Sequence, residues 1–261
     1  MKFIDQIGHV VEIRQTPNRI ISIVPSQTEL LFDIGLEEKV VGITKFCIHP
    51  SSWFKSKVRV GGTKTLNFEI IKQLNPDLII ANKEENTKAE IEALQKLYPV
   101  WTSNICTLPE CYEMIEEIGK ITDLEYKANQ MIAAIQKEFY RLKKTKKSNK
   151  KVLYLIWKEP YMTIGKSTFI NEIMNEGGFV NAIESTENYP LITIEEIKKI
   201  QPELIFLSTE PYPFKKTHSE EFKSICPNAQ IILVDGEVFS WYGSRIIKSP
   251  QFLIDLYTKI N

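Results

Sequence analysis

The chain has 261 residues, and its 33 Lys and Arg against 33 Asp and Glu give a formal net charge of zero at pH 7. This length accommodates one large domain or two small ones, and 43% hydrophobic with 25% charged residues is ordinary for a globular protein. The composition therefore excludes intrinsic disorder as the main state, and the lack of a basic excess argues against a nucleic-acid partner. No apolar run approaches the roughly 18 residues that suggest a membrane-spanning helix.

The first residues predict a cytoplasmic location. They read MKFIDQIGHVVEIRQ, without the run of roughly 7–15 apolar residues that a secretory signal needs. The four cysteines form no CxxC pair, and we expect them to be free thiols in a reducing compartment.

The N-terminal part alternates predicted strands with predicted helices. Residues 1–14 alternate apolar and polar side chains around Gly8, which predicts a short hairpin. Strands are then expected at 19–24, 40–44, 77–81 and 98–102, with helices from about 26, at 67–75 and at 87–97. This rhythm predicts an α/β layered fold with parallel strands buried on both faces.

The middle of the chain predicts long helices. Thr107 and Thr122 each begin a Thr-x-x-Glu sequence, the form of a capping box. Between 123 and 145 the apolar residues recur every three or four positions and form one stripe, so we expect a single helix about 34 Å long.

After residue 150 the alternation resumes. Strands are expected at 151–157, 203–208 and 230–235, and helices near 168–176, 193–201, 219–225 and 245–259. Residues 69–80 closely parallel 195–206, each reading as an acidic helix start, a proline and a buried strand. We therefore predict two Rossmann-like lobes: an N-terminal lobe over 1–106, linking helices over 107–148, and a C-terminal lobe over 149–261.

Ligands of open α/β sheets bind at the carboxyl ends of the strands, so residues that follow the strands are the candidates. Many are large aromatic residues beside an arginine, which suits a flat or bulky ligand with anionic groups. Loop packing is the alternative role for these aromatics, and helix capping is the alternative for Ser26. The candidate ligand-binding residues are Ser26, Gln27, Phe46, Cys47, His49, Lys83, Glu84, Trp157, Glu210, Tyr212, Trp241, Tyr242 and Arg245.

Catalytic and metal-binding signals are weak. Cys47-x-His49 with Glu84 lacks the spacing of a metal site, so no metal ligand is assigned. Nucleophile-elbow, Walker and dinucleotide-binding motifs are missing, so we assign no catalytic residue and no cofactor.

Taken together, the chain resembles the helical-backbone metal receptors, the substrate-binding proteins of ABC importers for cobalamin and ferric siderophores. The features that carry the resemblance run along nearly the whole chain. They are Arg19 to Ser26 with Thr28-Glu29, Gly61-Gly62, Glu69 to Ile79, the long central helix, and Asp235 to Arg245.

The resemblance implies two α/β lobes with mostly parallel central sheets, one rigid backbone helix and a ligand cleft between the lobes. It also implies that Glu69 and Glu195 are carboxylates that pair with arginines of an ABC permease. Phe46, Asp235 and Arg245 fall in ligand-facing loops of the cobalamin-binding member, which carries aromatics where this chain has Thr63 and Asn82.

The expected function is binding of a corrinoid, haem-like or iron-siderophore chelate for an importer, by a monomer that is not an enzyme. The family is exported, so the resemblance implies a periplasmic or cell-surface location, in conflict with the N-terminus. A signal-less subgroup is therefore expected. A cytoplasmic carrier, a sensor or a metal-dependent enzyme on the same scaffold is the alternative.

Overall fold

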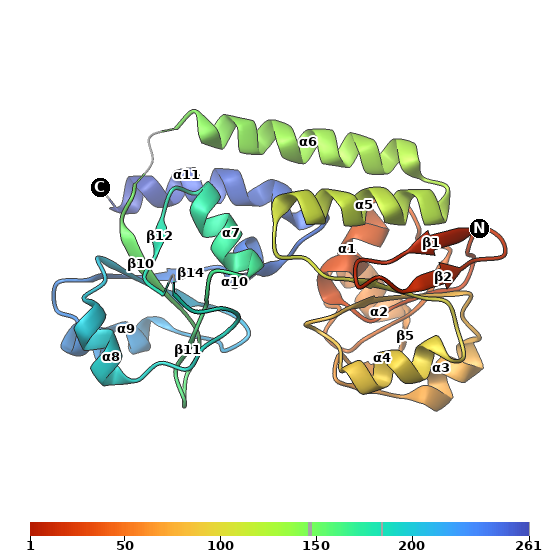
Figure 1. Cartoon of the computed structure of the whole chain (residues 1–261), viewed down its shortest axis with the longest axis horizontal. Helices are drawn as coiled ribbons and strands as arrows, with labels where there is room; N and C mark the ends of the chain where they lie inside the picture. Colours follow the sequence, from red (N-terminus) through yellow and green to blue (C-terminus); the bar gives the residue numbers. More distant parts are fainter. Residues whose placement is uncertain (146–147, 184, 261) are drawn as a thin grey trace. The chain divides into compact units, whose positions relative to one another are not determined.

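The computed structural model describes residues 1–145, 148–183 and 185–260 (Figure 1). The strands are β1 (Lys2–Ile4), β2 (Val10–Glu12), β3 (Ile20–Ser22), β4 (Val40–Ile43), β5 (Val58–Arg59), β6 (Gly61–Gly62), β7 (Thr65–Leu66), β8 (Leu78–Asn82), β9 (Val100–Ser103), β10 (Lys151–Trp157), β11 (Met162–Thr163), β12 (Val180–Asn181), β13 (Leu204–Ser208) and β14 (Gln230–Val234).

The α-helices are α1 (Pro25–Asp33), α2 (Ser51–Ser56), α3 (Phe68–Leu74), α4 (Lys88–Gln95), α5 (Leu108–Thr122), α6 (Glu125–Lys143), α7 (Phe169–Glu176), α8 (Ile194–Ile200), α9 (Lys216–Ile225), α10 (Gly236–Ser240) and α11 (Ser249–Ile260). A 3₁₀ helix, η1, covers Ser244–Lys248. The α/β fold class and the principal strands and helices expected in both halves are confirmed.

The described residues pack into two compact units. Unit 1 comprises those of Met1–Ile105, Pro109–Ala134 and Tyr242–Arg245, whereas unit 2 comprises those of Cys106–Leu108, Ile135–Trp241 and Ile246–Asn261. Helix α6 therefore belongs to unit 1 up to Ala134 and to unit 2 from Ile135. The sequence predicts two lobes and a set of linking helices, with boundaries at residues 106 and 148. This division of the chain into domains stays a prediction.

Unit 1 is built on a parallel sheet with the strand order β5-β4-β3-β8-β9. The central strand β3 pairs with β4 on one side and with β8 on the other, and its three residues are buried. Figure 1 shows α3 and α4 together on one side of this sheet and α1 on the other. The N-terminal hairpin is confirmed as the antiparallel pair β1 and β2.

Unit 2 repeats the same plan. Its sheet has the order β11-β10-β13-β14, with the short β12 also pairing with β10, and only β11 runs antiparallel. Side chains of β10 alternate between the faces, as the period of a strand requires. Leu153 and Leu155 join the apolar cluster that includes Ile197 of α8 and Phe222 of α9, whereas Tyr154 packs edge-on against Phe239 of α10.

The sequence echo has a common three-dimensional form. Helices α3 and α8 end at Asn75 (φ 43°) and Gln201 (φ 47°), both in the left-handed region. A proline follows each of these residues, and the residue after the proline directly precedes β8 or β13. The carboxylates of Asp77 and Glu203 then accept backbone N–H groups from Arg19 and Lys151, next to the central strand of each sheet.

The long middle helix is confirmed as α6, but one of the two expected caps is wrong. Thr122 ends α5 instead of capping α6, because its hydroxyl donates to the carbonyl of Ile118 at 2.7 Å. Asp123 then takes a left-handed conformation (φ 61°), and α6 begins two residues later.

Two further segments differ from the sequence expectation. The stretch expected as a continuous helix over 245–259 is η1 followed by α11, and Pro250 stands in the first turn of α11, where a proline is tolerated. Residues 236–240, expected as part of a loop, form α10 because the Asp235 carboxylate caps it by accepting the N–H of Glu237 at 3.0 Å. In the described part of the chain, no helix combines the length and apolarity needed to cross a membrane.

Candidate functional site

The first helix of unit 1 begins directly after β3 and carries two of the predicted site residues. Val24 occupies the N-cap position without a side-chain cap, so Ser26 lies inside the helix and is not its cap. Gln27 is fully buried, and its amide N–H donates to the Ser103 hydroxyl of β9. Ser26 therefore stays a candidate at the helix start, whereas Gln27 joins α1 to the sheet.

Phe46 and Cys47 are neighbours in sequence but have opposite environments. Phe46 is 50% exposed, and the Lys45 ammonium lies 5.1 Å from the centre of its ring. Cys47 is fully buried, with its sulfur 3.1 Å from the hydroxyls of both Thr28 and Thr44. Burial raises the pKa of the Cys47 thiol, so we leave it out of the proposed ligand site.

His49 is half-buried and precedes Pro50, two residues from the buried Cys47. Among residues 1–145, 148–183 and 185–260, no group of three or more His, Cys, Asp or Glu side chains is placed to hold a metal ion. The Cys47-x-His49 pair therefore gains no third ligand from the described residues.

The loop after β8 is held by the side chains of two asparagines, Asn82 and Asn86. The Asn82 side-chain oxygen accepts the N–H groups of Glu84 and Glu85, at 2.8 and 3.0 Å. Asn86 donates to the carbonyls of Ile23 and Thr63. Lys83 and Glu84 are thus exposed on a loop whose backbone is fixed. An Asn after a strand and another four residues later was the available signal, because asparagine side chains often bond to nearby backbone.

Unit 2 presents an aromatic pair at the carboxyl ends of adjacent strands. Trp157 ends β10 and is 40% exposed, and its ring stands edge-on to that of Tyr212, with centroids 5.7 Å apart. Tyr212 follows β13 and packs in turn against Phe214, at 4.7 Å between centroids. The structure therefore brings together two of the predicted ligand residues.

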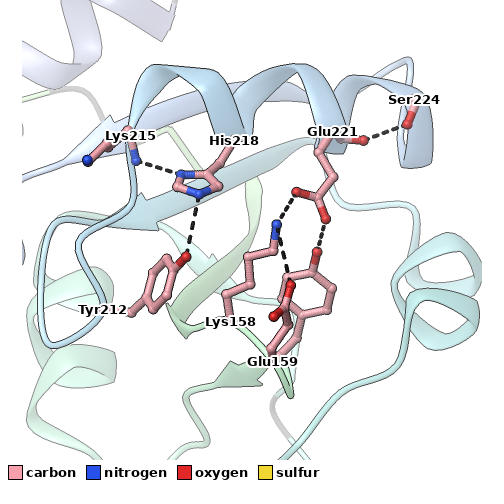
Figure 2. Close-up of polar contacts among 8 residues, drawn as sticks. Lys158, Glu159, Tyr212, Lys215, His218, Glu221 and Ser224 are labelled. Carbon is pink, nitrogen blue, oxygen red and sulfur yellow. Dashed lines mark hydrogen bonds and ion pairs between the residues drawn. The ribbon is translucent and has the colours of Figure 1, made fainter.

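Helix α9 holds both loops that carry this pair (Figure 2). The Lys158 ammonium lies 2.6 Å from one oxygen of Glu221, and the Tyr161 hydroxyl donates to the other. One turn earlier on α9, His218 lies beside the Tyr212 hydroxyl. Burial alone would raise the pKa of Glu221, but hydrogen bonds from Lys158 and Tyr161 outweigh it and lower that pKa.

Glu210 joins the loop after β13 to α10. Its carboxylate accepts the Ser240 hydroxyl at 2.7 Å. Gly236, at the start of α10, comes so close to the end of β13 and the loop after it that a Cβ there would overlap the Ser208 hydroxyl and the Glu210 side chain. Glu210 is therefore a half-buried carboxylate fixed near the edge of the sheet.

The aromatic pair before Arg245 is less accessible than the sequence analysis expected. Trp241 is 8% exposed and Tyr242 is 6% exposed, so most of both rings already packs against protein. Gly243 follows with a positive φ of 101°, and its N–H donates to the sulfur of Cys111 at 3.3 Å.

Arg245, predicted to contact ligand, forms a two-point ion pair inside unit 1. Its Nε donates to one oxygen of Glu29 at 2.6 Å and its terminal nitrogen to the other at 2.8 Å. This parallel geometry is the strongest form of an Arg–carboxylate contact, and it neutralises the guanidinium locally. Arg245 therefore fixes the 242–245 segment to α1.

Glu69 and Glu195 occupy equivalent positions in the two units. Each is the second residue of its helix, after the N-caps Asn67 and Thr193. Both are exposed, and within the described residues neither makes a hydrogen bond or ion pair with another side chain. The adjacent Glu196 closes the capping box of α8, so Glu195 is not needed for that role.

Comparisons with known proteins agree with this architecture. The family model for periplasmic binding proteins matches residues 20–226. An uncharacterized ABC transporter substrate-binding lipoprotein of Bacillus subtilis, YvrC, is 28% identical over 96% of this chain and 83% of its own length. A vitamin B12-binding protein of Vibrio cholerae is 30% identical over 73% of this chain and 70% of its own.

The fold itself also matches solved structures. The crystal structure of the periplasmic vitamin B12-binding protein BtuF of Vibrio cholerae superposes with a TM-score of 0.79 at 23% identity, covering 94% of this chain and 98% of that one. The described units, the strand order and the family match lead to one conclusion. The chain belongs to the periplasmic binding protein family.

Proposed function

We propose that this protein binds a metal chelate and delivers it to an ABC importer. The observation that carries the proposal is the partly exposed Trp157–Tyr212 pair at the carboxyl ends of β10 and β13. Exposed aromatic faces at this position suit a flat macrocycle or another large chelate. The names of two relatives, a substrate-binding lipoprotein and a vitamin B12-binding protein, support the same function.

The proposed ligand contacts are the exposed aromatic residues and the polar groups beside them. In unit 1 they are Ser26, Phe46, His49, Lys83 and Glu84, and in unit 2 they are Trp157, Glu210 and Tyr212. Corrinoids, haem and ferric siderophores are the candidate ligands. That such a ligand binds in a cleft stays a prediction. We propose no catalytic step, because the family binds substrates.

A titration tests the binding function. Cyanocobalamin, haemin and a ferric trihydroxamate would each be added to the purified chain at pH 7.5 and followed by calorimetry. We expect one of them to bind with micromolar affinity or better, and Trp157→Ala to weaken that binding by about tenfold or more, since a buried aromatic contact is worth roughly 1.5–3 kcal/mol.

The matched control is Tyr126→Ala, which removes an exposed aromatic residue of α6 outside the proposed site. It should leave the affinity unchanged. Failure of all three probes to bind, or equal effects of the two substitutions, would contradict the proposal.

We further propose that Glu69 and Glu195 dock on basic residues of the importer's membrane subunit. Two exposed, unpaired carboxylates at equivalent helix starts are well suited to this role, because an exposed partner can pair with them without breaking an existing contact. The Glu69→Gln/Glu195→Gln variant should bind the chelate normally but support less of its uptake by cells that carry the importer. Glu38→Gln, which alters an exposed carboxylate elsewhere, should change neither.

We also propose that the protein acts on the outer side of the cytoplasmic membrane, as the periplasmic family and the lipoprotein relative suggest. Fractionation of the native cells tests this location. Recovery of the protein only with cytoplasmic markers would contradict it and would favour the carrier or sensor alternative.

A further inference from the structure

The first turn of α9 fixes which nitrogen of His218 carries a proton. The backbone N–H of Lys215 donates to Nδ1 of His218 at 2.8 Å. A nitrogen that accepts a hydrogen bond is unprotonated, so the neutral ring carries its proton on Nε2. Nε2 lies 3.5 Å from the Tyr212 hydroxyl oxygen, as Figure 2 shows. His218 is therefore the donor and Tyr212 the acceptor in this long hydrogen bond.

The ring of His218 also supports Tyr212 by packing. The two rings meet edge to face with centroids 5.7 Å apart, and Phe214 packs against both. Because the Tyr212 oxygen accepts from His218, its own hydrogen is left to be donated elsewhere. His218 thus sets the position of the phenol and the direction in which it can donate.

We propose that neutral His218 is a positioning residue for the chelate site, which holds Tyr212 in its binding orientation and releases it on protonation. The proposal rests on the proposed function, because it assigns a regulation to the same aromatic pair. It makes chelate affinity depend on the charge of His218, so that protonation of the ring weakens binding.

The geometry gives the reason for release. Protonation places a hydrogen on Nδ1, which then faces the N–H of Lys215 donor to donor. A positive charge in the first turn of a helix is also opposed by the helix dipole. The imidazolium therefore has to leave the cap, and Tyr212 loses both the hydrogen bond and the ring contact.

The surrounding charges do not remove this conflict. Lys215 at the N-cap and Lys216 in the first turn of α9 are cationic, and Glu221 is the α9 carboxylate that acts on His218. Glu221 is already engaged by Lys158 and by the Tyr161 hydroxyl, both from the loop after β10.

The other elements packed on α9 add little charge. Tyr212 is the ionisable group that the loop after β13 places against the ring. Strand β14 carries no ionisable side chain, and on α8 the charge of Lys198 acts on Cys226, beyond the C-terminal end of α9.

His218→Gln is the matched variant. Glutamine at the third helical position can accept the N-cap N–H, as in a capping box, and its amide can also donate, but it does not titrate. With whichever of cyanocobalamin, haemin or a ferric trihydroxamate binds at pH 7.5, the wild-type affinity should fall about tenfold at pH 5.5. The Gln variant should change less than about twofold, and His218→Phe, which keeps a ring but no cap or donor, should bind weakly at both pH values.

Nitrogen-15 spectra of the ligand-free protein give an independent reading. His218, assigned by its loss in the Gln variant, should be the Nε2–H tautomer at pH 7.5, and its protonation should shift the ring signals of Tyr212. An Nδ1–H tautomer, or equal pH dependence of affinity in wild type and the Gln variant, would overturn the proposal. If no probe binds but the tautomer and the Tyr212 shift are found, the proposed function fails while the positioning of Tyr212 stands.

Discussion

At the scale of single residues, the ion pair of Glu29 and Arg245 joins distant parts of the sequence within unit 1. Both side chains are little exposed, at 13% and 11%. A charge in such a place is tolerated because its partner and its hydrogen bonds compensate for lost hydration. The pair joins residues 216 positions apart in the chain.

Arg245→Ala should lower the free energy of unfolding by about 3–5 kcal/mol, because it leaves the Glu29 carboxylate buried without a cation. Chemical denaturation measures the loss. The double variant Glu29→Leu/Arg245→Met replaces the pair with apolar side chains of similar volume and should recover much of the stability. A loss below about 1 kcal/mol in the single variant would show that the carboxylate is solvated.

Residue types could be chosen from the sequence, but their burial could not. Trp157 ends a predicted strand, Phe46 and Tyr212 follow two others, and all three are at least partly accessible as expected. Cys47 and Arg245 follow strands as well, yet the Cys47 sulfur is buried beside threonines and the Arg245 guanidinium is paired with Glu29. Nothing local distinguishes these cases, because a buried partner such as Glu29 comes from a distant part of the chain.

At the scale of elements, α5 and α6 approach each other closely at two small residues, Gly119 and Ala128. A Cβ added to Gly119 would lie 2.5 Å from the Cβ of Ala128, well inside the normal contact distance. This close approach explains a glycine inside a helix, where it costs about 1 kcal/mol relative to alanine.

Gly119→Ala should therefore destabilise the protein by about 1 kcal/mol or more, because an overpacked core costs roughly 1–3 kcal/mol and outweighs the gain in helix propensity. Thermal unfolding measures the change. In a double-mutant cycle with Ala128→Gly, the two changes should couple by about 1 kcal/mol. Additive effects of the two substitutions on stability would show that α5 and α6 can move apart without loss of stability.

The contacts of Glu221 with Lys158 and Tyr161, which join α9 to the loop after β10, should stabilise the protein less in acid. The folded-state pKa of Glu221 is lowered, so its stabilisation is complete above the pKa of the unfolded chain and is lost as the pH falls through the folded value. Glu221→Gln should lower stability at pH 7, and the difference from wild type should shrink below about pH 4, where unfolded glutamates protonate. A difference that stays constant between pH 7 and pH 3 would contradict this assignment.

Element types were predictable wherever the pattern was long and regular. The apolar stripe of α6, the β-branched run of β3 and the apolar run of β10 predicted the right structure. The short helices α2 and α10 were not predicted. For α10, an aspartate that follows a strand, as Asp235 does, is compatible with a loop as well as with a helix cap. The same limit applies to Asn75 and Gln201, which end helices in a conformation that glycine usually takes.

At the scale of the whole molecule, the balance of 33 basic and 33 acidic side chains brings the isoelectric point to about 6.9. A protein without net charge lacks the repulsion that keeps copies apart. We expect solubility to pass through a minimum within about one pH unit of that point, measured by precipitation with polyethylene glycol. The exposed-site variant Lys96→Glu/Lys137→Glu should move the minimum to lower pH, and an unmoved minimum would point to an apolar patch instead.

The general architecture was the most predictable level of all. Alternating strands and helices and the echo of 69–80 in 195–206 indicated two similar α/β units, and both sheets have the expected parallel core. The sequence did not reveal that residues 242–245 would pack with the N-terminal unit, because that placement depends on Glu29 and on Cys111.

This placement has a consequence for building hybrids with relatives. A chimera cut once, between the start of α6 and Tyr242, would take residues 242–245 and the rest of unit 1 from different parents. An exchange of unit 1 therefore requires two grafts, the N-terminal part and the short segment Tyr242–Arg245. In evolution, too, recombination at a single breakpoint between residues 29 and 245 would bring the two partners of this ion pair from different parents.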